Sequence, residues 1–276
     1  MQTRTIVTMG RGGTGKTTCV ALMAKYLIDT HSTPLLLVDA DPDQNLAEMV
    51  GVDLEAAGKM TVSELLSETF IQKGGTTVGV SPSARIENRI WEHGLFESES
   101  FDLLAVGTKW IEGCYCLPDA ALRNALGSIT RQYRYILIDS PAGLEHLNRK
   151  IASSVDTIVD IMGPSSKSFY HVRRARRIIH EAGIRCGRFV IAGGFAFPPD
   201  LGNRVTAETG SEYLGKISAD PVVAEYVLAG HSLLTLPDTS SAYRSVGELM
   251  DRIIRAYPDD SLSTPGRNQG TDNLIG

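Results

Sequence analysis

A glycine-rich stretch near the N-terminus has the residue types and spacing that bind nucleotide phosphates. It reads "MGRGGTGKTT" over residues 9–18, between a strand-like run and a helical pattern. Lys16 adds a positive charge at the β- and γ-phosphates, Thr17 offers Mg²⁺ a hydroxyl ligand, and the helix N-terminus adds its dipole. An incidental glycine-rich turn would not need this strand, this helix and the full spacing, so the sequence predicts a nucleoside-phosphate site. Its glycines, which let backbone N–H groups point into an anion, are Gly10, Gly12, Gly13 and Gly15.

The predicted nucleotide-contacting residues are Gly10, Arg11, Gly12, Gly13, Thr14, Gly15, Lys16, Thr17 and Thr18.

Carboxylates follow two further apolar runs. Asp39 and Asp41 end "LLLVDADPDQN", and Asp139 ends the run in "YILIDSPAG". Ligand loops of open α/β sheets gather at the carboxyl ends of the strands. One such carboxylate alone would be read as a solvated turn residue, but three in this order with the glycine loop predict one site.

Two closely spaced cysteines, Cys114 and Cys116, stand in a loop after an apolar run, with Pro118 placed as in a first helical turn. A thiol near a helix N-terminus has a lowered pKa, which favours the thiolate that metals bind. One chain supplies half of a tetrahedral thiolate site, and a two-fold dimer would supply four ligands for zinc or another thiophilic ion. Spacing alone leaves incidental thiols or a reversible local disulfide open.

Apolar runs alternate with helical patterns along the chain. This alternation predicts an α/β fold with a doubly wound, mostly parallel sheet flanked by helices. Residues 51–100 are expected to be a helical insertion on the rim of the sheet. The expected strands are 5–9, 34–40, 101–107, 135–140, 156–162 and 188–193. The expected helices are 16–30, 118–131, 144–153, 165–182, 220–229 and 240–256.

The composition is that of one soluble domain. The chain has 276 residues, 42% of them hydrophobic and 21% charged, and a formal net charge of −5. The acidic balance argues against a nucleic-acid partner, and no apolar run is long enough to span a membrane. No secretory signal is visible, so we expect a cytoplasmic protein. We expect residues 1–257 to form a single P-loop ATPase domain and the polar stretch 258–276 to be a disordered tail.

The loop Gly12–Thr17, preceded by Arg11, resembles the deviant phosphate loop of the MinD/ParA group of dimeric ATPases. In that group a lysine at the position of Arg11 reaches the partner's phosphates, so the resemblance implies a homodimer in which Arg11 acts in trans. Arginine keeps the charge but replaces a point charge by a planar fork.

The same resemblance implies ATP and Mg²⁺ as cofactors and assigns roles to the carboxylates. Asp41 would orient the attacking water, and Lys16, Asp41 and Arg11 would be the catalytic residues. Thr17 would bind Mg²⁺, with Asp39 near its water shell and Asp139 holding it through water. Residues 140–143 would form a switch that senses the γ-phosphate.

A narrower resemblance concerns the nickel-insertion accessory ATPases of carbon monoxide dehydrogenase (the CooC type). It rests on "GCYCLPDAALR" (113–123), "AGLEHLNR" (142–149) and "PSSKSFYHVRRARRI" (164–178), within a similarity that runs through most of residues 4–256. It implies that Cys114 and Cys116 bind Ni²⁺ or Zn²⁺ in a site shared across the dimer. The client would be carbon monoxide dehydrogenase or a related nickel enzyme.

Two departures from the nickel subgroup leave open a divergent branch that serves another nickel or iron client. The switch reads Ser140-Pro141, as in MinD-like proteins, where the nickel subgroup usually has Met-Glu. The stretch 191–200 also lacks the asparagine that commonly reads adenine, which leaves base selection open. The alternative is a MinD/ParA-like positioning or partitioning ATPase without a metal. An iron–sulfur reductase of the same fold is disfavoured, because its cluster cysteines come from well-separated segments.

Overall fold

The computed structural model describes residues 2–68, 82–107, 124, 126–141, 154–181 and 183–257. Within these residues one eight-stranded sheet has the order β3-β4-β2-β5-β1-β6-β7-β8, and every neighbouring pair is parallel except β3 with β4. The predicted doubly wound, mostly parallel α/β fold is confirmed.

The strands are β1 (Arg4–Gly10), β2 (Leu35–Asp39), β3 (Leu95–Glu97), β4 (Asp102–Ala105), β5 (Tyr135–Asp139), β6 (Ser154–Met162), β7 (Arg185–Gly193) and β8 (Glu212–Lys216). The helices are α1 (Lys16–Asp29), α2 (Asn45–Met49), α3 (Val62–Ser67), α4 (Pro82–Arg89), α6 (Ser166–Glu181), α7 (Gly202–Thr209), α8 (Pro221–Leu228) and α9 (Ser241–Arg255). Short irregular helices cover Ile90–Gly94, Thr130–Gln132, Pro199–Leu201 and Leu233–Thr235.

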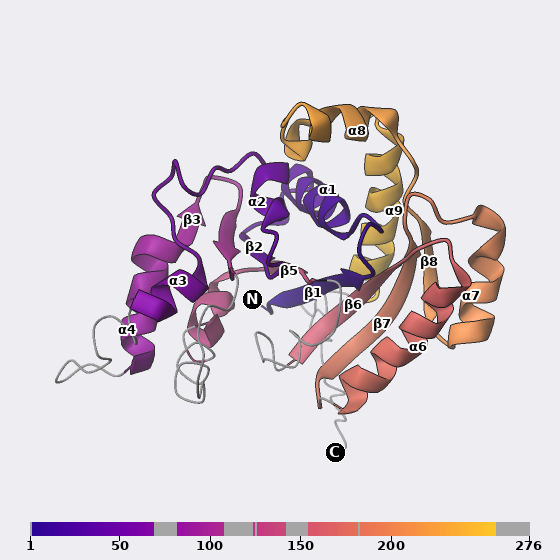
Figure 1. Ribbon diagram of the computed structural model, residues 1–276, viewed down its shortest axis with the longest axis horizontal. Helices are drawn as coiled ribbons and strands as arrows, with labels where there is room; N and C mark the ends of the chain where they lie inside the picture. The colour runs from indigo at the N-terminus through magenta and orange to yellow at the C-terminus, as the bar shows by residue number, and fades with distance from the viewer. Residues whose placement is uncertain are drawn as a thin grey trace, which may run out of the picture.

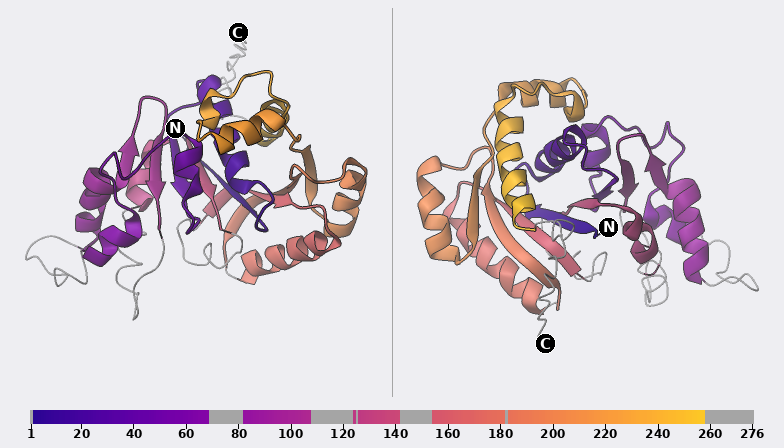
Figure 2. Two further views of the ribbon diagram at one scale, coloured as in Figure 1. Left: turned by 45° about the horizontal axis from the view of Figure 1, so that its top comes forward. Right: turned by 180° about the vertical axis from the view of Figure 1, so that it is seen from behind.

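The central strands are apolar because both faces of the sheet are covered. Every residue of β2 and β5 is buried. Helices α1 and α9 lie on one face and α6 on the other (Figures 1 and 2). Helix α1 is buried on almost every side because the sheet lies beneath it and α9 packs against it. Helix α6 instead buries a single stripe of Val172, Ala175 and Ile179, and its arginines are exposed.

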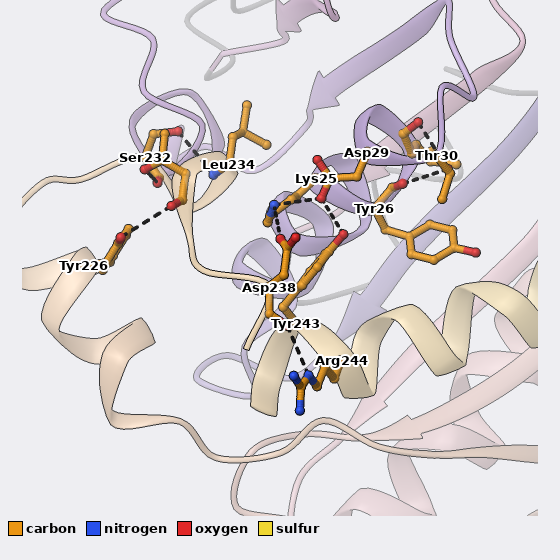
Figure 3. A network of polar contacts seen from close by, with 12 residues as sticks. Lys25, Tyr26, Asp29, Thr30, Tyr226, Ser232, Leu234, Asp238, Tyr243 and Arg244 are labelled. Carbon is orange, nitrogen blue, oxygen red and sulfur yellow. Dashed lines mark hydrogen bonds and ion pairs between the residues drawn. The ribbon is translucent and has the colours of Figure 1, made fainter. Parts of the chain in front are cut away.

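A polar network fastens α9 and the segment before it to α1 (Figure 3). The Lys25 ammonium lies 2.7 Å from an Asp29 carboxylate oxygen and 3.1 Å from one of Asp238. It also lies 4.5 Å from the centre of the Tyr243 ring. The Tyr243 hydroxyl in turn donates to Asp29 at 2.5 Å. The helix that begins at the glycine-rich loop is therefore held at its far end by side chains from the C-terminal part of the domain.

The region 51–100 is helical only in part. Helix α3 begins with a capping box between Thr61 and Glu64. Helix α4 and the turn Ile90–Gly94 follow, as expected for a rim insertion. The expectation of helices alone is wrong for 95–97, because β3 joins the sheet as an antiparallel edge strand. Its three residues pass from buried through half-buried to exposed, and so short a run carries no alternating pattern that could be read as a strand.

Strand β8 and helix α7 also were not predicted. Strand β8 carries one fully buried side chain, Leu214, so its pairing with β7 is not visible as an apolar run. The expected helix 144–153 and the tail 258–276 lie outside the described residues, as do 118–123 and 125 of the expected helix 118–131. No helix in the described ranges is long and apolar enough to cross a bilayer.

Candidate functional site: a phosphate loop beside two strand-end carboxylates

The glycine-rich loop joins the carboxyl end of β1 to the start of α1, as the sequence predicts. The Thr14 hydroxyl donates to the Arg11 carbonyl at 2.8 Å, which closes the loop. Arg11, Gly12 and Gly13 are exposed, and Lys16 and Thr18 are buried. Gly15 caps α1 in the left-handed conformation and has no side chain to accept from the first-turn N–H groups. These N–H groups and the helix dipole point to the open side of the loop, where an anion would bind.

Two glycines are required both by their positive φ angles and by close contacts. At Gly10 a Cβ would lie 2.5 Å from the Ile161 carbonyl oxygen of β6. At Gly15, with φ +89°, it would lie 2.4 Å from the Phe195 ring. At Gly12 and Gly13 a Cβ would meet nothing within 4 Å. The loop is therefore pressed against β6 and the segment after β7 on one side and open on the other.

Asp39 and Asp139 end two neighbouring strands at the same register position. Both are wholly buried. The Asp39 carboxylate accepts hydrogen bonds from the backbone N–H groups of Asp41 at 3.1 Å and Leu46 at 2.9 Å. Burial raises the pKa of Asp39 to about 6, although these two hydrogen bonds lower it. The carboxylate is thereby oriented by the loop that follows its own strand.

Neither carboxylate oxygen of Asp139 has a hydrogen-bond partner among the described residues. Burial raises the pKa of Asp139 to about 7. The Thr17 hydroxyl and the Lys16 ammonium lower this pKa, and the negative charge of Asp39 raises it. Burying a carboxylate without a partner is unfavourable in free energy. A cation or a water molecule bound to Asp139 would supply the missing interaction.

Asp41 lies half-exposed in the loop after β2. Its carboxylate accepts from the Asp43 N–H at 3.2 Å, and its carbonyl accepts from the Gln44 N–H at 3.1 Å. Asp41 adds to the negative field that raises the pKa of both Asp39 and Asp139. The structure thus brings together Lys16, Thr17, Asp39, Asp41 and Asp139, which the sequence places in three separate segments.

Sequence reasoning missed the residues that support the loop from β6 and β7. At Gly194 a Cβ would lie 2.5 Å from the Thr14 carbonyl oxygen, and at Gly163 one would lie 3.3 Å from the Thr14 methyl group. Phe195 packs against Gly15. The paired glycines in "IAGGF", directly after a buried strand, are the signal that could have indicated this close approach.

The predicted metal ligands Cys114 and Cys116 lie outside the described residues, as do positions 142 and 143 of the predicted switch. Ser140 and Pro141 follow β5, and the Ser140 N–H donates to the Thr8 carbonyl at 3.0 Å. Among the residues that the structure describes, no group of three or more His, Cys, Asp and Glu side chains is placed to hold a metal ion.

The profile of the AAA domain family AAA_31 matches residues 3–181, which include the phosphate loop and both strand-end carboxylates. The chain belongs to this family. This AAA domain protein is a P-loop ATPase whose fold is shared with MinD and ParA proteins. ATP and Mg²⁺ fit its site, because the loop offers an open glycine face and the oxygens of Asp139, close to Thr17, have no hydrogen-bond partner within the described ranges.

Two relatives are similar over nearly their whole length. An ATP-binding protein of Methanocaldococcus jannaschii is 30% identical over 253 residues, which cover 90% of this chain and 98% of the relative. The carbon monoxide dehydrogenase accessory protein CooC of Rhodospirillum rubrum is 29% identical over 261 residues, which cover 90% of this chain and 97% of the relative.

Solved structures share the fold. The septum site-determining protein MinD of Pyrococcus horikoshii, in complex with Mg-ADP, superposes with a TM-score of 0.66 at 21% identity and covers 92% of this chain and 97% of its own. A ParA family ATPase of Chlorobium tepidum superposes with a TM-score of 0.67 at 15% identity and covers 91% and 98%.

Proposed function

We propose that this ATPase is a nucleotide-dependent dimeric maturation factor that helps insert nickel into a metalloenzyme such as carbon monoxide dehydrogenase. The observation that carries the proposal is the 29% identity to CooC over 90% of the chain, combined with the Cys114-Tyr-Cys116 segment. CooC is a carbon monoxide dehydrogenase accessory protein. A nucleotide switch alone does not require two closely spaced thiols.

In this proposal the described site holds the nucleotide. Lys16 and the N–H groups of the loop would bind the phosphates. Thr17 would hold Mg²⁺, Asp139 would hold it through water, and Asp39 would lie near its water shell. Bound Mg²⁺ neutralises charge on the phosphate oxygens. Asp41 holds and orients the attacking water, since it is the site carboxylate that solvent reaches.

The loop also supplies a residue for a second copy of the chain. Arg11 stands on the exposed side of the loop, and its carbonyl is fixed by Thr14. In a two-fold dimer that brings the loops face to face, the Arg11 guanidinium reaches the partner's phosphates, and Cys114 and Cys116 of both protomers form a four-thiolate site. Nickel is the cargo of this site rather than a resident cofactor.

The test is metal content measured together with oligomeric mass under anaerobic, reducing conditions, with and without ATP and Mg²⁺. We expect about one Ni²⁺ or Zn²⁺ per dimer, as four thiolates at one axis would bind. The double variant Cys114→Ser, Cys116→Ser should lose the metal and still bind nucleotide. Cys186→Ser is the matched control, because this free thiol on β7 is not one of the predicted metal ligands, and its loss should leave the metal content unchanged.

The second candidate is a MinD/ParA-like positioning or partitioning switch without a metal. It is favoured by the Ser140-Pro141 pair and by the MinD and ParA fold neighbours. A nucleotide-dependent dimer that binds no metal would support this candidate and overturn the metal-delivery proposal. Loss of nucleotide binding in the double cysteine variant would show that the cysteines are structural.

A further inference from the structure

A cavity lies at the opposite end of the sheet from the phosphate loop. It has a volume of about 310 Å³. Its walls come from the amino-terminal halves of β1, β5 and β6 and from the last turn of α9, whereas the phosphate loop follows the carboxyl end of β1. This volume is at the lower end of the range for small-molecule pockets, roughly 300–1,000 Å³.

The cavity combines apolar walls with a cationic lining. Ile6, Ile253 and Ile254 supply aliphatic surface, and Tyr135 and Tyr257 add aromatic rings. Arg4, Arg134 and Arg255 also line it, with Asp156 as the only acidic residue among the lining residues described. The positive excess contrasts with the acidic net charge of the chain, so it is a local feature of this cavity.

Hydrogen bonds, an ion pair and a cation–π contact hold the residues of the cavity wall in place. The Tyr257 hydroxyl donates to the Asp156 carbonyl at 2.6 Å, and the Arg4 guanidinium lies 4.7 Å from the centre of the Tyr257 ring. The Asp156 carboxylate accepts from the Thr5 N–H at 2.8 Å and lies 3.5 Å from Arg4. At Gly187 a Cβ would lie 3.0 Å from the Tyr257 hydroxyl, so glycine leaves the space that Tyr257 occupies.

One buried hydroxyl group in the cavity wall makes no hydrogen bond within the described chain. Thr157 lines the cavity from β6, its side chain is wholly buried, and its hydroxyl has no hydrogen-bond partner among the described residues. Buried hydroxyl groups are ordinarily paired. Thr157 therefore marks a polar position in the wall of the cavity.

We propose that this cavity binds a small amphipathic anion, an organic carboxylate, sulfonate or phosphate with an apolar body. The isoleucines and tyrosine rings take the apolar body, while Arg4 and Arg255 take the anionic group. The site is separate from the nucleotide site and does not depend on the metal proposal.

The test uses the fluorescent anion 1-anilinonaphthalene-8-sulfonate with the full chain, under saturating ADP and Mg²⁺. We expect one saturable site that ADP does not displace. Arg255→Gln should weaken binding about threefold or more, a modest loss because this guanidinium is largely exposed. Neutral N-phenyl-1-naphthylamine, which lacks the sulfonate, should bind Arg255→Gln as it binds the wild type. Arg244→Gln, an exposed charge change at the other end of α9, is the matched control and should leave binding unchanged.

A methyl NMR spectrum of threonine-labelled protein locates the probe independently of affinity. The Thr157 resonance is assigned by its loss in Thr157→Val, and we expect it to shift on addition of the sulfonate. The proposal is overturned if no saturable binding occurs, if ADP displaces the probe, if Arg255→Gln binds it as the wild type does, or if the Thr157 methyl resonance does not move.

Discussion

Asp39 and Asp139 stand side by side at the ends of β2 and β5, equally buried but unequally satisfied. Asp39 accepts two backbone N–H groups, and Asp139 accepts none among the described residues. The loop after β2 turns back over its own strand end and supplies the donors to Asp39. In the proposed function the Asp139 carboxylate is available to hold Mg²⁺.

We predict that Asp139→Ala stabilises the nucleotide-free protein and removes its response to ADP with Mg²⁺. Deleting a buried carboxylate without a partner should raise the free energy of unfolding by about 1–3 kcal/mol. Thermal unfolding with and without ADP and Mg²⁺ measures both effects. Asp41→Ala is the control, because this half-exposed carboxylate should change the nucleotide-free stability little. A destabilised Asp139→Ala protein that still gains stability from ADP and Mg²⁺ would contradict the assigned role.

Gly10 and Gly12 should respond differently to alanine. In Gly10→Ala the new Cβ meets the Ile161 carbonyl oxygen at 2.5 Å, where backbone must move. We expect a loss of about 1–3 kcal/mol in the free energy of unfolding, measured by urea denaturation. In Gly12→Ala the Cβ meets nothing within 4 Å, and stability should stay within about 0.5 kcal/mol of wild type. Equal losses in the two variants would show that the loop does not pack against β6.

Arg11 and Asp41 provide a test of action in trans. Arg11→Ala and Asp41→Ala should each hydrolyse ATP at least about tenfold more slowly than wild type. If Arg11 serves the partner's site, mixing the two variants creates dimers in which one site has both residues, and activity should partly return. If both residues serve the same site, the mixture should be no more active than its components.

Asp160 offers a pH-dependent stability test away from the nucleotide carboxylates. It lies on β6, wholly buried, with neither carboxylate oxygen partnered in the described chain. Burial raises its pKa to about 7. His171 on α6 is the facing titratable group, with its Nε2 atom 4.0 Å from Asp160. Burial and the fields of Arg11, Arg174 and Lys16 lower the pKa of His171, which favours its neutral form.

Between pH 4 and 7 the unfolded chain releases the Asp160 proton and the folded chain keeps it, so this residue lowers stability as pH rises. Asp160→Val removes that effect. We expect the variant to gain on the order of 2–4 kcal/mol over wild type at pH 8 and much less at pH 5. Urea unfolding at both pH values measures the gain. A gain that does not depend on pH would mean that Asp160 does not titrate in this range.

The parts of the fold that the sequence predicts well are those whose signal is local. The apolar runs of β2 and β5 are continuous because both faces of each strand are buried, and the stretch from Gly10 to Thr18 carries its glycines, lysine and threonines within nine positions. Strand β3 is different, because three residues form it only by pairing with β4. Strand β8 likewise depends on β7 and has one fully buried side chain.

By itself, then, the sequence determined the doubly wound fold, the phosphate loop and the order of Asp39, Asp41 and Asp139 along the chain. Only the tertiary structure decided that Asp139 has no hydrogen-bond partner among the described residues while Asp39 has two donors, and that Gly194 and Phe195 support the loop from behind. It also decided that Arg4, Thr157 and Tyr257 share one cavity. A residue's type and its neighbours in sequence set backbone conformation and burial preference, whereas partners distant in the chain are chosen when strands pair and helices pack over them.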